Sequence, residues 1–240
     1  MFPYIQAPRM TAAVLVAAAI LTGHFLLIRR ARRAGLDTGT AAGFSASMLA
    51  GGLLMGHLVK LLYVPNFWTV VQGSPWILLR IFSGQASFGG LLGGLLGGLA
   101  YLRWRRSSLE ATLRWFDLIA VVFPYAWILG RAQCVVVHDH PGIRTTSWLG
   151  VRYPDAVRFD LAVIEILFLL ALVVALLPLQ RRLWSPGFHC GAFLVPYGVF
   201  RLLLDQLHVD VVRYLWWSVD QWASTLAILA GVAFMTASRR

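Results

Sequence analysis

The sequence predicts an all-α, polytopic membrane protein with about seven transmembrane helices, the N-terminus outside and the C-terminus cytoplasmic. Of its 240 residues, 59% are hydrophobic, and the mean hydropathy is +0.71. A soluble domain of this length could not bury so much apolar surface, so lipid is the expected solvent. Apolar stretches of spanning length, with arginines grouped at their ends, predict the same class. We expect residues 1–240 to form a single transmembrane domain.

Seven stretches are apolar and close to the roughly 20 residues that a spanning helix needs. The first lacks a basic leader segment and a convincing cleavage site, so we interpret it as a retained helix. Between the second and third, residues 67–81 have the pattern of short helices that lie on the membrane surface. The predicted spans are residues 11–28, 42–63, 86–102, 115–134, 160–179, 188–207 and 220–237.

The arginine groups orient these spans. They follow the first, third, fifth and seventh, and the positive-inside rule places each group in the cytoplasm. The loops 64–85, 135–159 and 208–219 are then outside, and residues 135–159 form an outer loop region. The arginines are Arg29, Arg30, Arg32 and Arg33, then Arg103, Arg105 and Arg106, then Arg181 and Arg182, and finally Arg239 and Arg240.

The net charge of +11 therefore marks topology, and no nucleic-acid partner is expected. Twenty of the twenty-one basic residues are arginine, whose guanidinium group matches phosphate geometry. The two cysteines, Cys134 and Cys190, are too few for a disulfide framework and lack metal-type spacing. We assign them no redox role.

The third span carries glycines four residues apart, in the run GGLLGGLLGG from Gly89 to Gly98. This spacing lets two helix backbones approach closely. One interpretation is tight helix packing alone. The other is that these small residues open a groove for a lipid chain, which makes Gly89 and Gly90 candidate substrate-binding residues.

Ionisable residues inside spans are costly in lipid, so they indicate an interior cavity with a function. His24, Lys60 and Asp117 lie near span ends, where snorkelling or helix capping explains them. The others are His57, Arg131, Glu165, Arg201 and Asp205.

Three polar residues share one face of the sixth span, because Tyr197, Arg201 and Asp205 are spaced four apart. They form either an intrahelical ion pair, which hides the arginine charge, or a clamp for phosphate.

Basic residues also occur outside, against the topology trend. Arg144, Arg152 and Arg158 follow the segment GRAQCVVVHDHPG of residues 130–142. Positive charge at the outer leaflet suggests an anionic partner, and a phospholipid headgroup is the obvious one.

The same segment offers catalytic acids or bases in His138, Asp139 and His140, because the histidine pKa lies nearest neutrality. A His-x-His pair also occurs in metal sites, but no third ligand is evident. We expect neither a metal nor another cofactor.

Four patterns, in the correct order on the predicted helices, resemble the prolipoprotein diacylglyceryl transferase family over most of the chain. They are a Gly-Gly-Leu-Ile-Gly run, a Gly-Arg signature that reaches an acidic residue eight positions later, a segment of the Arg-His-Pro type with Tyr-Glu, and Tyr-Gly-x-x-Arg-x-x-x-Glu. They match residues 89–93, Arg131 with Asp139, Arg158 with Glu165, and Tyr197 with Arg201 and Asp205.

The chain departs from the family pattern at five positions. Phe88 replaces the usual histidine before the glycine pair, and Cys134 replaces the signature asparagine. Asp139 and Asp205 stand where the family has glutamate, and His57 stands where it has arginine on the second helix.

The resemblance implies a multi-pass enzyme of the bacterial cytoplasmic (inner) membrane, with the loop 135–159 periplasmic. Such an enzyme moves a diacylglyceryl group from phosphatidylglycerol, or a similar anionic phospholipid, to the lipobox cysteine of a prolipoprotein signal peptide. A thiolate attacks the glyceryl C3 carbon and glycerol 1-phosphate leaves. The enzyme therefore has to remove the thiol proton and stabilise phosphate charge.

We assign the phosphate to Arg131 and Arg201, held in position by Glu165 and Asp205. The base is His138, Asp139 or His140, since Phe88 cannot serve. The further substrate-binding candidates are Tyr197, Arg158, Gly89 and Gly90.

Two alternatives stay open. The replaced signature residues motivate a paralogue that keeps the fold but uses another lipid or acceptor. The glycine-rich span and the buried charges would also suit a non-catalytic lipid-binding or transport protein, although the sequence shows no internal repeat of the kind common in transporters.

Overall fold

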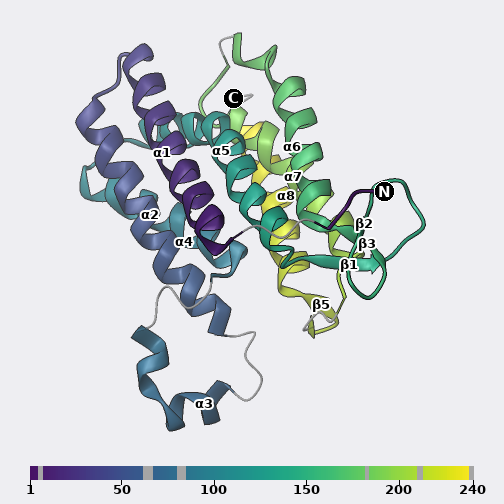
Figure 1. Cartoon of the computed structure of the whole chain (residues 1–240). Coiled ribbons are helices and arrows are strands. Elements are labelled where there is room, and N and C mark those ends of the chain that lie inside the picture. The colour runs from purple at the N-terminus through teal and green to yellow at the C-terminus, as the bar shows by residue number, and fades with distance from the viewer. Residues whose placement is uncertain (5–7, 62–66, 80–84, 182–183, 210–212, 238–240) are drawn as a thin grey trace. The chain divides into compact units, whose positions relative to one another are not determined.

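The computed structural model describes residues 1–4, 8–61, 67–79, 85–181, 184–209 and 213–237, and helices account for most of them. Each of the seven predicted spans lies mostly within one α-helix (Figure 1). Residues 67–79 form two short helices, in agreement with the prediction of short helices over 67–81, of which residues 80 and 81 lie outside the described part of the chain. The helices are α1 (Arg9–Arg33), α2 (Thr38–Leu61), α3 (Phe67–Gly73), η1 (Pro75–Leu79), α4 (Ser87–Trp104), α5 (Leu109–Val137), α6 (Leu161–Leu176), η2 (Leu179–Arg181), α7 (Phe188–Asp205) and α8 (Val219–Ala237).

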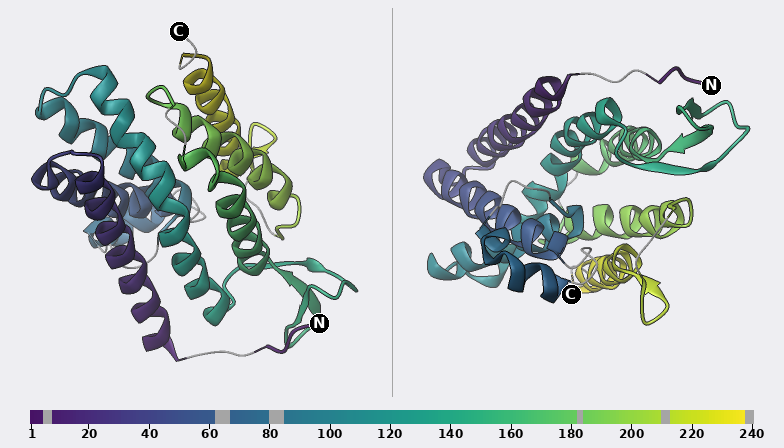
Figure 2. Two further views of the ribbon diagram at one scale, coloured as in Figure 1. Left: turned by 90° about the horizontal axis from the view of Figure 1, so that it is seen from above. Right: turned by 60° about the horizontal axis from the view of Figure 1, so that its bottom comes forward.

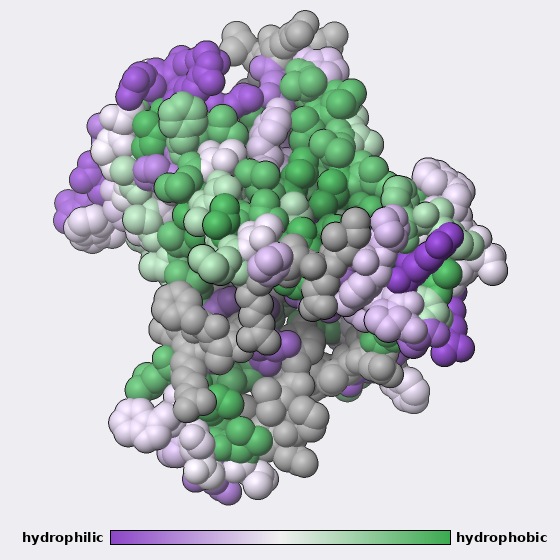
Figure 3. Space-filling view, viewed as in Figure 1, coloured by the Kyte–Doolittle hydropathy of each residue, from purple (hydrophilic) through white to green (hydrophobic). Residues whose placement is uncertain are grey.

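Four of these helices are long and apolar enough to cross a membrane, namely Met10–Arg33, Thr38–Leu61, Leu109–Val137 and Val219–Thr236. The helix Leu161–Leu176 is apolar but shorter. On the face shown in Figure 3, hydrophobic residues cover α6. Its exposed Leu167, Leu170 and Val174 suit contact with lipid. The chain is a helical membrane protein, while seven crossings and the orientation of the termini stay predictions.

The expectation of an all-α fold was wrong in two of the connections predicted to lie outside. Between α5 and α6, β1 (Pro141–Arg144), β2 (Gly150–Arg152) and β3 (Val157–Asp160) form an antiparallel sheet in the order β1-β3-β2. Between α7 and α8, β4 (Arg213–Tyr214) pairs with β5 (Trp217–Ser218). Strands of two to four residues are too short to show the alternating hydropathy that predicts a strand.

The chain divides into two compact units. One contains Met1–Leu27 and Leu113–Arg240, and the other contains Ile28–Thr112.

In the unit Ile28–Thr112, α2 and α4 pack through their glycines. Gly89 is buried, and a Cβ atom placed there would lie 2.6 Å from Cβ of Val59, besides meeting the carbonyl oxygen of Met55. The structure therefore fits the packing interpretation of the glycine run, and Gly89 has no space beside it for a lipid chain. Gly90 is looser, because the nearest atom to its Cβ position is a Gly52 oxygen at 3.8 Å.

In the other unit, the two ends of α7 are held by different kinds of hydrogen bond. At the start of α7, the Asp117 carboxylate accepts hydrogen bonds from the backbone N–H groups of Gly187 (2.7 Å) and Cys190 (2.9 Å). Asp117 is thus a helix cap, as its place near a span end predicted. At the other end of α7, the N–H of Ile143 donates to the carbonyl of Leu207 (2.9 Å), so β1 is tied to the chain that follows α7.

The strands consequently mark one end of the helices α5 to α8 (Figures 1 and 2). The C-terminal ends of α5 and α7 and the N-terminal ends of α6 and α8 lead into or out of these strands. Arg131, Glu165, Arg201 and Asp205 lie in the turns of α5, α6 and α7 nearest this strand-bearing end.

Candidate functional site

The centre of the site is the carboxylate of Glu165, in the second turn of α6 and only 1% exposed. Its Oε1 accepts hydrogen bonds from the Tyr197 hydroxyl of α7 (2.7 Å) and from the Trp127 indole N–H of α5 (2.8 Å). A buried carboxylate is stable only when donors and opposite charges surround it. Glu165 therefore links three helices through one side chain.

Two arginines approach the other oxygen of Glu165. Oε2 lies 2.9 Å from Nε of Arg131 on α5 and 3.1 Å from Nη1 of Arg201 on α7. The Arg131 guanidinium also stacks over the Trp127 ring, with Cζ 5.0 Å from the ring centroid. The predicted convergence of these two guanidinium groups is present in the structure.

The second carboxylate partner of Arg201 differs from the expected one. Nη2 of Arg201 lies 3.1 Å from Oδ2 of Asp220, in the first turn of α8. The intrahelical pair of Arg201 with Asp205 was the prediction, but Oδ2 of Asp205 accepts a hydrogen bond from the Ser218 hydroxyl (2.8 Å). Ion pairing in this bundle runs between helices, because their inward faces meet the neighbouring helix and not water.

Asp205 nevertheless helps to position the ion pairs, because it holds the start of α8, which carries Asp220. Ser218 precedes α8, and its hydroxyl accepts from the N–H of Gln221 (2.9 Å), while the Gln221 side chain accepts from the N–H of Ser218 (3.1 Å). This reciprocal pair is a capping box. By holding Ser218, Asp205 fixes the helix end that carries Asp220.

A similar device positions Glu165. The carboxylate of Asp160 caps α6 by accepting from the N–H groups of Ala162 (3.1 Å) and Val163 (3.4 Å). Its other oxygen pairs with Nδ1 of His138 (2.8 Å) and accepts from the hydroxyl of Tyr153 (3.0 Å). His138 is buried and stacks on Tyr4, with ring centroids 4.2 Å apart. The structure thus gives His138 a positioning contact with α6.

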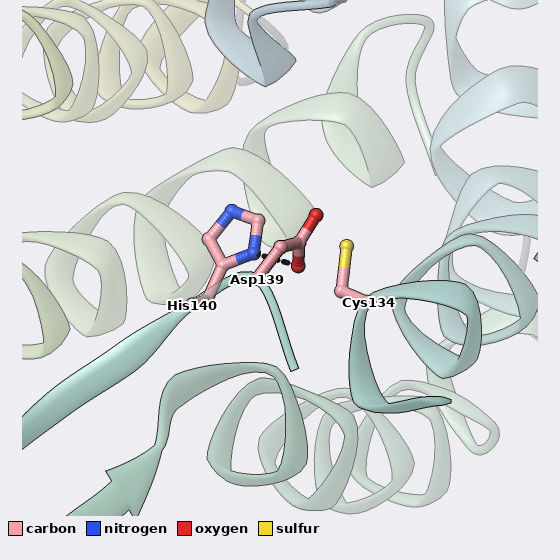
Figure 4. A group of neighbouring side chains, drawn as sticks. All are labelled: Cys134, Asp139 and His140. Carbon is pink, nitrogen blue, oxygen red and sulfur yellow. Dashed lines mark hydrogen bonds and ion pairs between the residues drawn. The ribbon is translucent and has the colours of Figure 1, made fainter. Parts of the chain in front are cut away.

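The other two base candidates meet Cys134, near the end of α5. Nδ1 of His140 pairs with Oδ1 of Asp139. One donor atom from each of Cys134, Asp139 and His140 lies within 4.8 Å of the others. Figure 4 shows these three side chains pointing toward one another. Burial alone would lower the pKa of His140, but its hydrogen bonds to Asp139 and Cys134 raise that pKa to about 9.

Arg158, expected to bind substrate, holds the strand segment together. Its guanidinium donates to the carboxylate of Asp155, with Nη2 2.6 Å from Oδ2, and to the carbonyl of Gly142 (3.1 Å). The ion pair with Arg158 keeps the pKa of Asp155 below its usual value. Gly89 and Gly90 lie in the other unit, where they face α2.

Sequence reasoning missed three members of this end of the bundle. Trp127 carries no charge and lies inside an apolar span, so nothing in the pattern marks it. Asp220 could have been noticed as the first residue of a predicted span. Cys134 was interpreted as a cysteine without metal-type spacing and as a departure from a family pattern, although it stands five residues before Asp139.

Apolar helices around a buried ion network define a membrane protein with a polar centre near the strand-bearing end of α5 to α8. Such a centre is a functional site by default, since unpaired charge in lipid is costly.

The chain belongs to the prolipoprotein diacylglyceryl transferase family, whose model matches residues 10–237. It is 25% identical over 208 residues to the phosphatidylglycerol–prolipoprotein diacylglyceryl transferase of Symbiobacterium thermophilum. The aligned region covers 82% of this chain and 76% of that protein. The enzyme of the same name from Rhizobium leguminosarum bv. trifolii is 26% identical over 244 residues (93% and 85%). That from Erythrobacter litoralis is 30% identical over 174 residues (65% and 60%). The family and these names indicate a transferase of lipoprotein biosynthesis.

Proposed function

We propose that this protein transfers a diacylglyceryl group from phosphatidylglycerol to the lipobox cysteine thiol of prolipoproteins, at the periplasmic face of the bacterial inner membrane. Family membership supports the reaction class. The observation that carries the proposal is the meeting of Arg131 and Arg201, from two different helices, at one oxygen of Glu165.

The two arginines suit the phosphate of the donor lipid. The leaving glycerol 1-phosphate gains negative charge as the C–O bond breaks, so donors fixed in advance lower the barrier. A guanidinium has five N–H donors in a planar fork. The Arg201 contacts with Glu165 and Asp220 involve two of its nitrogens, so capacity for phosphate oxygens remains. Glu165 keeps the charge balanced between turnovers.

The acceptor thiol must lose its proton beside this phosphate site. Nη1 of Arg131 lies 3.8 Å from Sγ of Cys134, which connects the arginines to the group formed by Cys134, Asp139 and His140. The side chains of His140 and Asp139 are 30% and 47% exposed, so a peptide thiol can reach them. Of the three base candidates, Asp139 and His140 are therefore more accessible to the acceptor thiol than the buried His138.

The test is modification of a lipobox peptide by the purified protein in phosphatidylglycerol-containing detergent, followed by mass spectrometry for the thioether product. Restoration of lipoprotein modification in cells depleted of their own enzyme is the matching assay in cells. Absence of product in both assays would contradict the proposal. Product with another lipid, and none with phosphatidylglycerol, would favour the diverged paralogue, and lipid binding without any transfer would favour a binding or transport protein.

Alanine variants of the arginines would be ambiguous, because each removes one of the two guanidinium groups paired with the buried Glu165, and breaking a buried ion pair costs about 3–5 kcal/mol and threatens folding. Arg131→Lys and Arg201→Lys retain the positive charge but lose the planar fork. We expect each to reduce turnover by about 100-fold or more, as removal of a single transition-state donor does. Arg105→Lys is the control, since Arg105 is exposed at the end of α4, where its guanidinium lies 3.5 Å from the hydroxyl of Thr40 and near the exposed Asp37. Unchanged turnover in both buried variants would remove the two arginines from the mechanism.

A further inference from the structure

We propose that Cys134, Asp139 and His140 bind a Zn²⁺ ion whose fourth coordination position takes the acceptor thiolate. The second half of this statement rests on the proposed transferase function, whereas the metal site itself does not. The sequence suggested no third ligand beside His138 and His140. In the structure His138 faces Asp160, and Cys134 supplies the third donor.

The backbone explains why these three side chains meet. Cys134 lies four residues before His138, whose N–H donates to the Cys134 carbonyl at 2.8 Å. His138 has a positive φ of 52°, and this left-handed residue ends α5 in the manner of a helix C-cap. The chain therefore turns back directly after α5, which brings Asp139 and His140 beside the Cys134 thiol (Figure 4).

The donor set suits zinc. Thiolate, imidazole and carboxylate are the three protein ligands of Zn²⁺, with bond lengths of about 2.3 Å to sulfur and about 2.0–2.2 Å to nitrogen and oxygen. Donor atoms within 4.8 Å of one another need only small side-chain rotations to surround such an ion. A thiolate and an imidazole together select zinc over magnesium or calcium, which prefer oxygen.

A second group, Asp205, His208 and Asp220, also meets the distance condition, but its carboxylates already have partners. Asp220 pairs with Arg201, and Asp205 accepts from Ser218. A metal there would have to compete with the guanidinium group. The group at the end of α5 is therefore the better zinc site.

Three protein ligands leave one zinc position open, as in catalytic zinc sites. A thiol that binds there is deprotonated, and its proton passes to water. Water can reach the site because the Asp139 and His140 side chains are partly exposed. The bound sulfur then donates an electron pair to the glyceryl C3 carbon, forming the S–C bond. The C3–O bond breaks, and its electron pair leaves with the oxygen of glycerol 1-phosphate beside Arg131. Zinc thus performs the thiol activation that the proposed reaction requires.

The experiment measures metal directly, in the full-length protein purified in detergent. We expect about one zinc per chain, the ratio of a single site with three protein ligands. Cobalt substitution should give the absorption band of a cobalt–thiolate bond. Cys134→Ala, Asp139→Asn and His140→Gln should each weaken zinc binding by more than about 100-fold, a larger loss than that from removing outer partners. Cys190→Ala is the matched control, because Cys190 is also a buried free cysteine.

Two further measurements separate the parts of the inference. A lipobox peptide should change the cobalt spectrum, and the same peptide with serine in place of its cysteine should not. His208→Gln should keep the zinc, since the His140 and His208 rings lie 6.4 Å apart and His208 is outside the proposed ligand set. Loss of zinc in this variant would indicate four protein ligands and overturn the open position.

The outcomes for the metal site and for the transferase reaction are distinct. Transfer by a protein that binds no zinc overturns the metal site and leaves the proposed function intact. Zinc binding without any diacylglyceryl transfer supports the site while contradicting the proposed function. Zinc binding together with full transfer after chelation overturns the role of the metal in activating the thiol.

Discussion

Arg131 and Arg201 share one oxygen atom, Oε2 of Glu165, at 2.9 and 3.1 Å. Two like charges can stay this close only because a buried carboxylate lies between them, with Asp220 beside Arg201 as a further counter-charge. Removing a member of this group therefore affects stability as well as function.

Glu165→Gln should destabilise the fold strongly. The change leaves two buried guanidinium groups without their shared carboxylate, and breaking a buried pair costs about 3–5 kcal/mol. Thermal unfolding in detergent measures the effect. Glu110→Gln, an exposed change in the first turn of α5, should cost less than about 1 kcal/mol. Equal effects in the two variants would mean that the ion network contributes little.

Asp205 and Ser218 should act as one unit. Ser218→Ala removes the cap of α8 and should cost about 1 kcal/mol. Asp205→Asn weakens the hydrogen bond to the same hydroxyl. Because the residues are in contact, the double variant should lose less stability than the two single losses added together, by about 0.5 kcal/mol or more. Strict additivity in the unfolding free energies would argue against this coupling.

The Asp155–Arg158 pair gives a dependence on pH. Because the pKa of Asp155 is lowered in the folded protein, its contribution to stability is complete above the unfolded pKa of about 3.8 and is lost as pH falls through the folded pKa. Arg158→Gln should raise the pKa of Asp155 toward its ordinary value, measured by NMR of the carboxyl carbon. An unchanged pKa of Asp155 would mean that Arg158 does not form this ion pair, and would favour the substrate-binding role that the sequence suggested.

Two neighbouring glycines should respond differently to the same change. Gly89→Ala places a methyl group against α2, with its Cβ 2.6 Å from that of Val59, so α2 and α4 must separate and stability should fall by about 1–3 kcal/mol. Gly90→Ala has room, with its nearest neighbour at 3.8 Å, and should be neutral or stabilising through higher helix propensity. The free energies of unfolding of both variants in detergent measure this difference. The packing account predicts the ranking, whereas a lipid groove at Gly89 would reverse it.

Much of the helical framework could be predicted from the sequence, because a spanning helix needs a long apolar run and composition reveals it. The convergence of Arg131 and Arg201 could also be anticipated, since charge within a span requires an interior partner. Identifying those partners was harder. Spacing along one helix suggested Asp205, whereas packing between helices supplied Asp220, and sequence spacing contains no information about a neighbouring helix.

The group around Cys134 was missed for a different reason. Its members are at most six residues apart, but they face one another because His138 adopts a left-handed backbone conformation that few non-glycine residues take. The short strands β1 to β5 escaped prediction because two to four residues do not establish a period. Both features depend on local turns, which hydropathy does not report.

The turn at His138 has a consequence for folding order. Bringing Cys134, Asp139 and His140 together closes a loop of only seven residues, and the entropic cost of such closure is small. The Glu165 centre, in contrast, requires four helices from distant parts of the chain to assemble. The thiol-bearing turn is therefore a low-contact-order element, able to take shape as soon as the end of α5 has formed and before the arginines find their shared carboxylate.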